Sequence, residues 1–388
     1  MSGIVLSAAV RQNLLSLQNT AELLSSTQNR LASGKKVNTA LDNPTNFFTA
    51  QGLDNRASDI NNLLDGIGNG VQVLQAANTG LTSLQQLVDT AKSIANQVLQ
   101  TTTGYTQKST ATTAAALPVG STSANLVDGA AIKSGETLTI AATGGGTATS
   151  FTFGATTSLA QLNTALAANN LTASLDSSND LVLTTTNDVA SSTIGAITLG
   201  AAGTATFAAP VAPTPDPNSQ ATRASLVTQY NNIITQITTT SQDASFNGIN
   251  LLNGDDLKLT FNETGKSTLT VSGVTYDAAG LGLSTLTPGT DFRDNSSANA
   301  VIAKVTAASD QLRSEASALG SNLSIVQIRQ NFAKNLINVL QTGSANLTLA
   351  DTNEEAANSQ ALSTRQSIAV SALALSNQSQ QSVLQLLR

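Results

Sequence analysis

A few clusters in this 388-residue chain have the residue types that bind ligands or catalyse reactions. Gly144–Gly146 has the composition of a phosphate loop, but no Lys-Ser or Lys-Thr pair follows it, so we interpret it as a connection between strands. Asp351, Glu354 and Glu355 form a group of carboxylates. They lie at the predicted start of the last helix, where the helix dipole stabilises acidic side chains, so a structural role is the better interpretation.

Two smaller charged clusters and two absent residue types further limit the chemistry that the chain can perform. Asp255-Asp256 follows a turn signal and is typical of a solvated loop, and Lys35-Lys36 is too short a basic run to bind nucleic acid. The chain has no His and no Cys. His general bases, His-dependent triads, disulfides and thiolate metal sites are therefore excluded. The sequence predicts a protein that is not an enzyme and that carries no cofactor and no catalytic or metal site.

The composition restricts the partners and the kind of core. A net charge of −6 argues against nucleic acid and anionic membranes as partners. Apolar runs are too short to span a bilayer, which takes about 20 residues. No basic residue precedes the apolar segment 4–10, so we expect that segment to belong to the mature protein. Aromatic residues make up only 3% of the chain, so its helices must bury aliphatic stripes.

Both ends of the chain read as amphipathic helices with more apolar surface than one partner can cover. The first has a coiled-coil stripe that steps by alternating four and three residues and ends before Ser33-Gly34. That stripe consists of Val10, Leu14, Leu17, Ala21, Leu24, Gln28 and Leu31. The last helix, from about residue 346, has one face with Leu362, Ala369 and Leu373 and a second with Ile368, Ala372 and Leu375. A helix that is apolar on two faces must be buried on several sides, which indicates a packed assembly.

Three more helices and a hairpin are expected between these ends. Heptad spacing predicts long helices from about residue 47 to 100 and from 296 to 342, the second with a four-residue stutter after Leu319. We expect Gly343 to end that second helix. Another helix begins near Gln220, and alternating apolar residues predict a β-hairpin over 257–271.

Residues 103–218 differ in composition from the rest of the chain. They are rich in Ser, Thr, Ala and Gly, and five of the seven prolines lie near their edges. Alternation at 138–140, 151–153 and 181–183 predicts strands, and 158–168 predicts a short helix. We expect a small α+β domain that is exposed at the surface.

Four motifs in the right order resemble those of bacterial flagellins. Residues 30–40 read R-L-A-S-G-K-K-V-N-T-A, and 245–254 read S-F-N-G-I-N-L-L-N-G. Residues 353–366 resemble the C-terminal helix of alphaproteobacterial members, and 382–388 read S-V-L-Q-L-L-R. The resemblance covers about 1–100 and 219–388. In many flagellins the variable domain precedes the late rod helix, whereas here the large insertion separates two early helices.

The resemblance implies a mainly α fold: a long helical rod, a terminal coiled coil of N- and C-terminal segments, a β-hairpin and an inserted small α+β outer domain. Residues 1–36 plus 346–388 would form the inner coiled-coil domain. Residues 37–102 plus 219–345 would form the rod, and 103–218 the outer domain. The chain would be a secreted structural subunit that polymerises into the extracellular flagellar filament.

The partners implied are other flagellin subunits, the flagellar export apparatus, the filament cap and hook-junction proteins, with no nucleic acid and no membrane. The expected subunit interface consists of apolar residues on the two terminal helices: Val10, Leu14, Leu17, Ala21, Leu24, Leu31, Leu362, Ile368, Ala372, Leu375, Val383 and Leu386. Two alternatives stay open. One is a hook–filament junction protein, which shares the terminal helices, and the other is a surface binding module displayed by 103–218.

Overall fold

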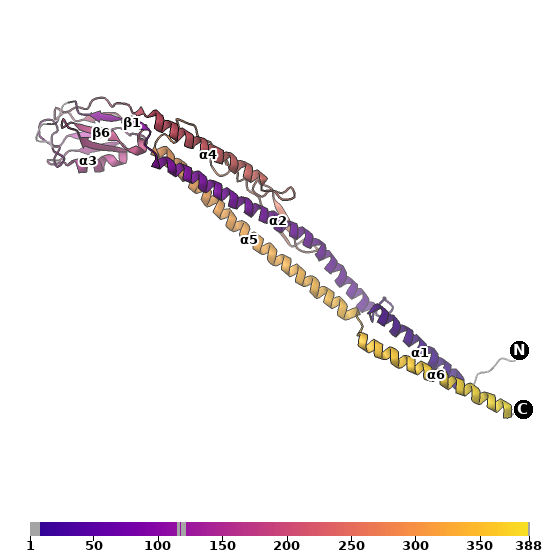
Figure 1. Ribbon diagram of the computed structural model, residues 1–388. Helices are drawn as coiled ribbons and strands as arrows, with labels where there is room; N and C mark the ends of the chain where they lie inside the picture. Colours follow the sequence, from indigo (N-terminus) through magenta and orange to yellow (C-terminus); the bar gives the residue numbers. More distant parts are fainter. Residues whose placement is uncertain (1–7, 115–116, 118–121, 387–388) are drawn as a thin grey trace. The chain divides into compact units, whose positions relative to one another are not determined.

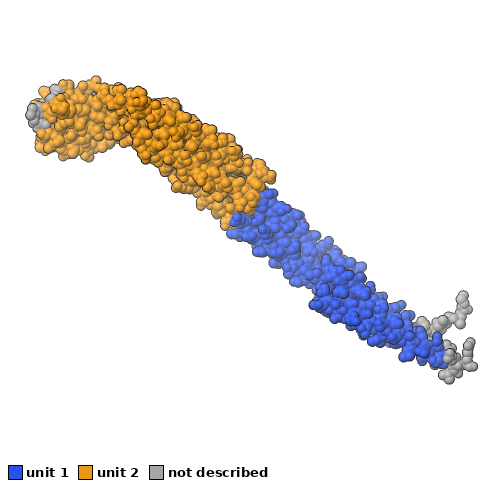
Figure 2. All heavy atoms as spheres, viewed as in Figure 1, with its two compact units in different colours: residues 1–70, 258–269, 325–388 blue, residues 71–257, 270–324 orange. Residues whose placement is uncertain are grey.

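The computed structural model describes residues 8–114, 117 and 122–386, and the chain forms two compact units (Figures 1 and 2). Unit 1 comprises residues 1–70, 258–269 and 325–388, and unit 2 comprises 71–257 and 270–324. The fold is mainly α with small sheets, as the sequence predicted. Its long helices are α1 (Ala8–Ser33), α2 (Pro44–Gln100), α4 (Pro217–Asp243), α5 (Asn295–Thr348) and α6 (Thr352–Leu386). No helix in the described residues is both long enough and apolar enough to cross a membrane.

Helix α2 begins at Pro44, about three residues before the start near residue 47 that the sequence predicted. Pro44 is the first helical residue, where its missing N–H costs no hydrogen bond. Asn43 caps the helix, because its side-chain Oδ1 accepts from the backbone N–H of Asn46 at 3.0 Å. Proline therefore starts the helix here.

The heptad stripes of α2 and α5 form the core of each unit, as expected. In unit 1, Ala57 and Ile60 of α2 pack against Ala333, Ile337 and Leu340 of α5. In unit 2 the same two stripes stay buried, and α4 adds a third apolar face. The buried residues of unit 2 on these three helices include Leu74, Leu81, Leu84, Val88 and Val98 of α2, Val305, Ala308, Leu312 and Leu319 of α5, and Leu226, Tyr230, Ile234 and Ile237 of α4.

The break between α5 and α6 is not at Gly343, and that prediction was wrong. Helix α5 continues through Gly343 to Thr348, since an interior glycine costs a helix only about 1 kcal/mol relative to alanine. The chain turns at Leu349–Asp351 instead. There the backbone N–H of Lys36 donates to Thr348 O at 2.7 Å, and that of Ala350 donates to Gly34 O at 3.0 Å. The segment after α1 thus fixes the place where α5 ends.

The β-hairpin lies where the sequence predicted it. Strands β9 (Leu257–Thr260) and β10 (Thr268–Val271) pair, and Gly265 takes a left-handed conformation (φ 70°) in the loop between them. In unit 1, Leu259 packs so closely over Gly70 that a Cβ at Gly70 would lie 2.3 Å from Leu259 Cδ2. A side chain at residue 70 would therefore have to displace the Leu259 side chain.

The insertion in unit 2 has two three-stranded sheets around one apolar core. One sheet has the order β2-β6-β5 and the other β4-β3-β7. Helix α3 (Leu159–Leu166), which has a capping box between Ser158 and Gln161, contributes Leu162 and Leu166 to the core. The strands are β2 (Thr110–Thr112), β3 (Thr137–Ile140), β4 (Thr149–Thr152), β5 (Leu171–Leu175), β6 (Leu181–Thr185) and β7 (Ile197–Leu199), with 3-10 turns at Ala167–Asn169 and Asn187–Val189. Sequence alternation predicted three of these strands and the helix.

The two ends of the insertion meet at its base. Strand β1 (Tyr105–Gln107) pairs with β8 (Thr214–Pro215), and the backbone N–H of Asp216 donates to Gly104 O at 2.9 Å. The buried guanidinium of Arg223 donates to Thr102 O at 2.9 and 3.0 Å and to Phe292 O at 2.9 Å. One side chain of α4 therefore holds the carbonyl groups of two segments beside the insertion.

A candidate subunit interface on the terminal helices

The pairing of α1 with α6 is antiparallel and is fixed at one end by an ion pair. Arg30, in the last turn of α1, donates to the Glu355 carboxylate at 3.3 Å, and Glu355 is only 8% exposed in the first turn of α6. Asp351 caps α6, because its Oδ1 accepts the backbone N–H groups of Asn353 and Glu354 at 2.9 and 3.3 Å. These carboxylates therefore serve the helix start and the helix pair, as the structural interpretation expected.

The seam between α1 and α6 is poor in large apolar side chains. On α1 it contains Val10, which is buried, and Leu17 and Leu24, which are half-buried. The positions between them hold polar residues, namely Asn13, Thr20 and Thr27. The α6 side of the seam follows heptad spacing and is also mixed: Ser359, Leu362, Gln366, Ala369, Leu373 and Ser376. Polar layers alternate with apolar ones, so this seam buries little aliphatic surface for its length.

The outward faces of the same helices expose large aliphatic side chains. Exposed fractions on α6 are 63% for Ile368, 50% for Val370 and 69% for Leu375. On α1 they are 61% for Leu15 and 56% for Leu23. A groove between the helices is lined by Leu15, Leu23, Ile368 and Ala369 together with polar side chains such as Arg365. These helices therefore leave several large aliphatic side chains in contact with water, in surroundings that are partly polar.

The expected interface residues divide between the seam and the outward faces. Val10, Leu17, Leu24 and Leu362 lie in the seam, whereas Leu14, Ala21, Leu31, Ile368, Ala372 and Leu375 are exposed. Val383 and Leu386 fall within α6, but their side chains lie outside the described residues. Sequence reasoning missed Leu15, Leu23 and Val370, which are off the heptad stripe. Their only signal is that they are aliphatic residues beside a stripe that is already apolar.

The other clusters singled out in the sequence have structural roles. Gly144–Gly146 lies in the connection between β3 and β4. Asp255 Oδ2 accepts the backbone N–H of Asn250 at 2.8 Å and so holds a loop. Lys36 Nζ donates to Asn346 O at 3.3 Å. Among the described residues, no group of three or more His, Cys, Asp or Glu side chains has an arrangement that fits a metal ion.

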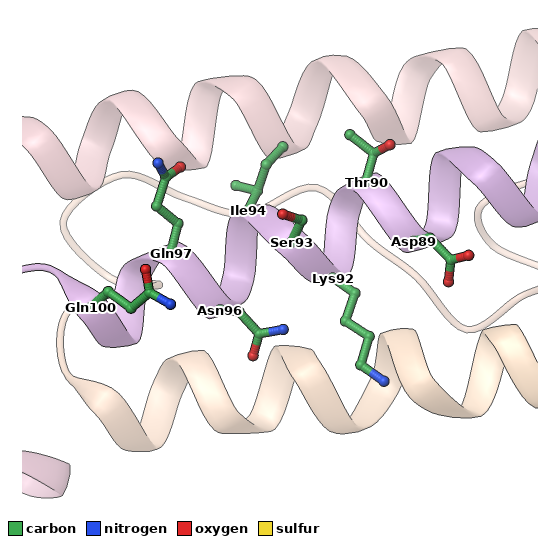
Figure 3. Close-up of a pocket in the computed structure, with 8 residues that line it drawn as sticks. All are labelled: Asp89, Thr90, Lys92, Ser93, Ile94, Asn96, Gln97 and Gln100. Atoms are coloured by element: carbon green, nitrogen blue, oxygen red, sulfur yellow. The ribbon is translucent and has the colours of Figure 1, made fainter.

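Unit 2 has a second surface hollow, on the face of α2 between residues 89 and 100. In Figure 3, Thr90 and Ile94 point towards α4, whereas Lys92 and Asn96 point towards α5. The hollow has a volume of about 400 Å³. Its lining is largely amides and hydroxyls with one carboxylate, Asp89, and one ammonium group, Lys92.

Comparison with known proteins gives both ends of the chain the same relatives. Residues 5–117 match the bacterial flagellin N-terminal helical region, and residues 302–387 match the bacterial flagellin C-terminal helical region. The chain is 32% identical over 165 residues to the flagellins FljM and FljK of Caulobacter vibrioides. That stretch covers 42% of this chain and 59% of each relative. A separate comparison aligns 90 residues of the chain with flagellin A of Rhizobium meliloti at 37% identity, and these residues make up 23% of each protein.

Proposed function

Because this chain belongs to the bacterial flagellin family, we propose that it is the structural subunit of a bacterial flagellar filament and that it acts by polymerising. One observation supports this mechanism above the others. The outward faces of α1 and α6 expose more large aliphatic side chains than the α1–α6 seam encloses. An isolated subunit leaves that surface in water, and packing against other subunits removes it.

The energetics favour assembly through these faces. Full burial of one large aliphatic side chain contributes about 1.5–3 kcal/mol, and Leu14, Leu15, Leu23, Leu31, Ile368, Val370 and Leu375 all retain exposed area. Ordering long polar side chains opposes this gain, at up to about 2 kcal/mol for each residue. The terminal helices limit that cost because their outward faces carry many Ala and Ser residues, which lose little side-chain entropy.

The setting follows from the same proposal. The subunit is secreted through the flagellar export apparatus and assembles outside the cell, beneath a cap and beyond hook-junction proteins. Its main partners are further copies of flagellin. The family relationship and the unpaired helix faces support this assignment over a surface binding module. The insertion offers few aromatic side chains for stacking on a ligand, and one of them, Phe153, is buried in its core.

The test is a charge placed on the outward face of α6. Ile368→Asp should leave the helix content and thermal unfolding of the monomer unchanged, because the side chain is 63% exposed there. Filament formation from seeds should be lost, since a carboxylate would be buried in the assembly without a partner. The readouts are circular dichroism for the monomer and sedimentation with negative-stain microscopy for the filament.

A matched control separates this effect from a general effect of charge. Val211→Asp introduces the same carboxylate on the insertion, where Val211 is 51% exposed, and should polymerise like the original chain. Normal filaments from Ile368→Asp would refute the proposed interface. Failure of the unaltered chain to grow beyond short oligomers on flagellin seeds would favour the junction protein instead.

A further inference from the structure

A second apolar stripe lies on α5 in unit 1, on the side of the helix that faces away from its core. Ile325, Ile328, Phe332 and Val339 are 42%, 65%, 58% and 66% exposed. With Asn335 and Thr342, which are also exposed, they follow heptad spacing. The opposite side of the same helix carries the buried stripe of Ala333, Ile337 and Leu340 that packs on α2. This segment is therefore apolar on two sides, and only one of them is covered.

The outward side of α2 in unit 1 has the same spacing but the opposite shape. After Phe48, which is 61% exposed, the positions at steps of four and three are all exposed and all small. They are Gly52, Asn55, Asp59, Asn62, Gly66 and Asn69. Apart from the chain neighbours and the adjacent backbone of α2 itself, no atom of the subunit lies within 4 Å of where a Cβ would stand on Gly52 or Gly66. Each glycine weakens the helix by roughly 0.5–1 kcal/mol relative to alanine, and packing within the subunit does not explain it.

The two helix segments also carry opposite charges. The α5 segment 325–348 carries Arg329 and Lys334 and no acidic residue. The α2 segment 44–70 exposes Asp54, Asp59 and Asp65, and its only cation, Arg56, is 2.8 Å from Glu263. The helix segment that carries the apolar ridge is thus basic, and the segment that carries the notched face is acidic, with Asp59 on the notched stripe itself.

We propose that the α5 ridge, Ile325, Ile328, Phe332 and Val339, packs against the notched α2 face, Phe48 to Asn69, of a neighbouring copy. This inference rests on the proposed polymerisation and names a second contact in it, separate from the terminal helices. Two different surfaces of one chain that fit each other make a heterologous contact, and repetition of such a contact builds an open helical polymer. The exposed glycines let the bulky ridge approach the α2 backbone closely.

The glycine side of the contact gives a test in which monomer stability and assembly move in opposite directions. Gly66→Leu should raise or preserve the thermal unfolding temperature of the monomer, because leucine is the better helix former. The same change fills the notch, so the critical concentration for polymerisation should rise at least tenfold. Gly320→Leu is the matched control: Gly320 also lies in a helix with open space around it but off both stripes, and its critical concentration should stay unchanged.

The ridge side is tested by truncation. Ile328→Ala should raise the critical concentration about tenfold, whereas Gln327→Ala, at the exposed neighbouring position, should leave it within about twofold. Unchanged critical concentrations for both Gly66→Leu and Ile328→Ala would overturn this contact, and would also show that any partner of the ridge is not another copy. The proposed function would survive that result if Ile368→Asp still blocked assembly.

Discussion

Polar side chains buried in this protein hold the backbone and one another. Arg223 donates three hydrogen bonds to two backbone carbonyl groups at the base of the insertion, and the Tyr276 hydroxyl donates to Glu315 at 3.0 Å. Tyr276 is 8% exposed and Tyr230 is 1% exposed. Burial, followed by the nearby carboxylates of Glu315 and Asp291, raises the pKa of both tyrosines to about 12. Because of these pKa shifts, the stability of the folded state should depend on pH in the alkaline range.

We expect the monomer to lose stability between about pH 10 and 12. An unfolded tyrosine has a pKa of about 10, so the folded state retains the proton that the unfolded chain releases. The stability that the protonated tyrosines contribute is complete below pH 10 and falls as the pH rises through the folded-state pKa. Thermal unfolding at stepped pH, with tyrosinate absorbance recorded in parallel, measures both quantities.

Tyr276→Phe is the matched variant for this prediction. It removes the titrating group next to Glu315, so the alkaline fall in unfolding temperature should become smaller. At neutral pH it should cost about 1.5–3 kcal/mol, the usual contribution of a hydrogen bond to a charged group. A chain whose three tyrosines all titrate near pH 10 would contradict the prediction.

The helices differ in how well their partners cover them. In unit 1, α2 and α5 enclose an aliphatic core, whereas α1 and α6 meet across a seam in which Thr and Gln layers separate the leucines. Isolated helices are marginal in water, and most helical stability in proteins comes from packing. The α1–α6 pair therefore depends on an external partner more than the α2–α5 pair does.

We expect limited proteolysis to trim both ends of the monomer quickly and to spare the same ends in the filament. Polymerisation would bury the outward faces of α1 and α6 and so suppress their opening. Leu17→Asp should prevent filament growth and leave the fragment that contains α2, α4 and α5 intact, because Leu17 lies on α1 and is not part of the core that α2 and α5 form. Mass spectrometry of the fragments identifies the cut sites. Equal resistance of the ends in monomer and filament would disprove this coupling.

For the chain as a whole, the insertion is a structure with its own core that joins the helices through two close strands. Its apolar cluster is built from residues 111–205, and the backbone atoms of Gly104 and Asp216 are hydrogen-bonded at 2.9 Å. Its removal therefore opens only a short gap. The Arg223 contacts to Thr102 and Phe292 lie outside the removed segment.

Deletion of residues 105–215 with a two-residue Gly-Ser bridge should preserve folding and filament formation. The expected results are an unchanged cooperative unfolding transition for the remaining helices and filaments of reduced diameter by negative-stain microscopy. A bridge-length series provides the control, since bridges of two and six residues should behave alike. If every deleted chain folds but none polymerises, the insertion contributes to the subunit interface and its proposed place outside the core is wrong.

The local features of this fold follow from the sequence because short-range rules produce them. Heptad spacing identified the buried stripes of α2 and α5, including the continuation after Leu319, and turn residues placed the β9–β10 loop. Alternation in the insertion predicted β3, β4 and β6. The lack of His and Cys excluded whole classes of chemistry before any fold was known. Each of these inferences depends on residues within a few turns of one another.

Tertiary structure decided which apolar face turns inward. Periodicity shows that α6 has two apolar faces, but only its pairing with α1 selects the Leu362 face for the seam and leaves the Ile368 face exposed. The helix break at Leu349 rather than Gly343 has the same origin, because hydrogen bonds from Lys36 and Ala350 join segments about 310 residues apart. The exposed ridge on α5 could likewise not be told apart in the sequence from the other apolar residues of that helix. Only the structure shows that the side with Ala333, Ile337 and Leu340 is the buried one. The spacing of apolar residues along the chain shows which helix faces are apolar. Which of those faces is buried and which stays exposed depends on packing between segments that are distant in the sequence, and that packing exists only in the folded molecule.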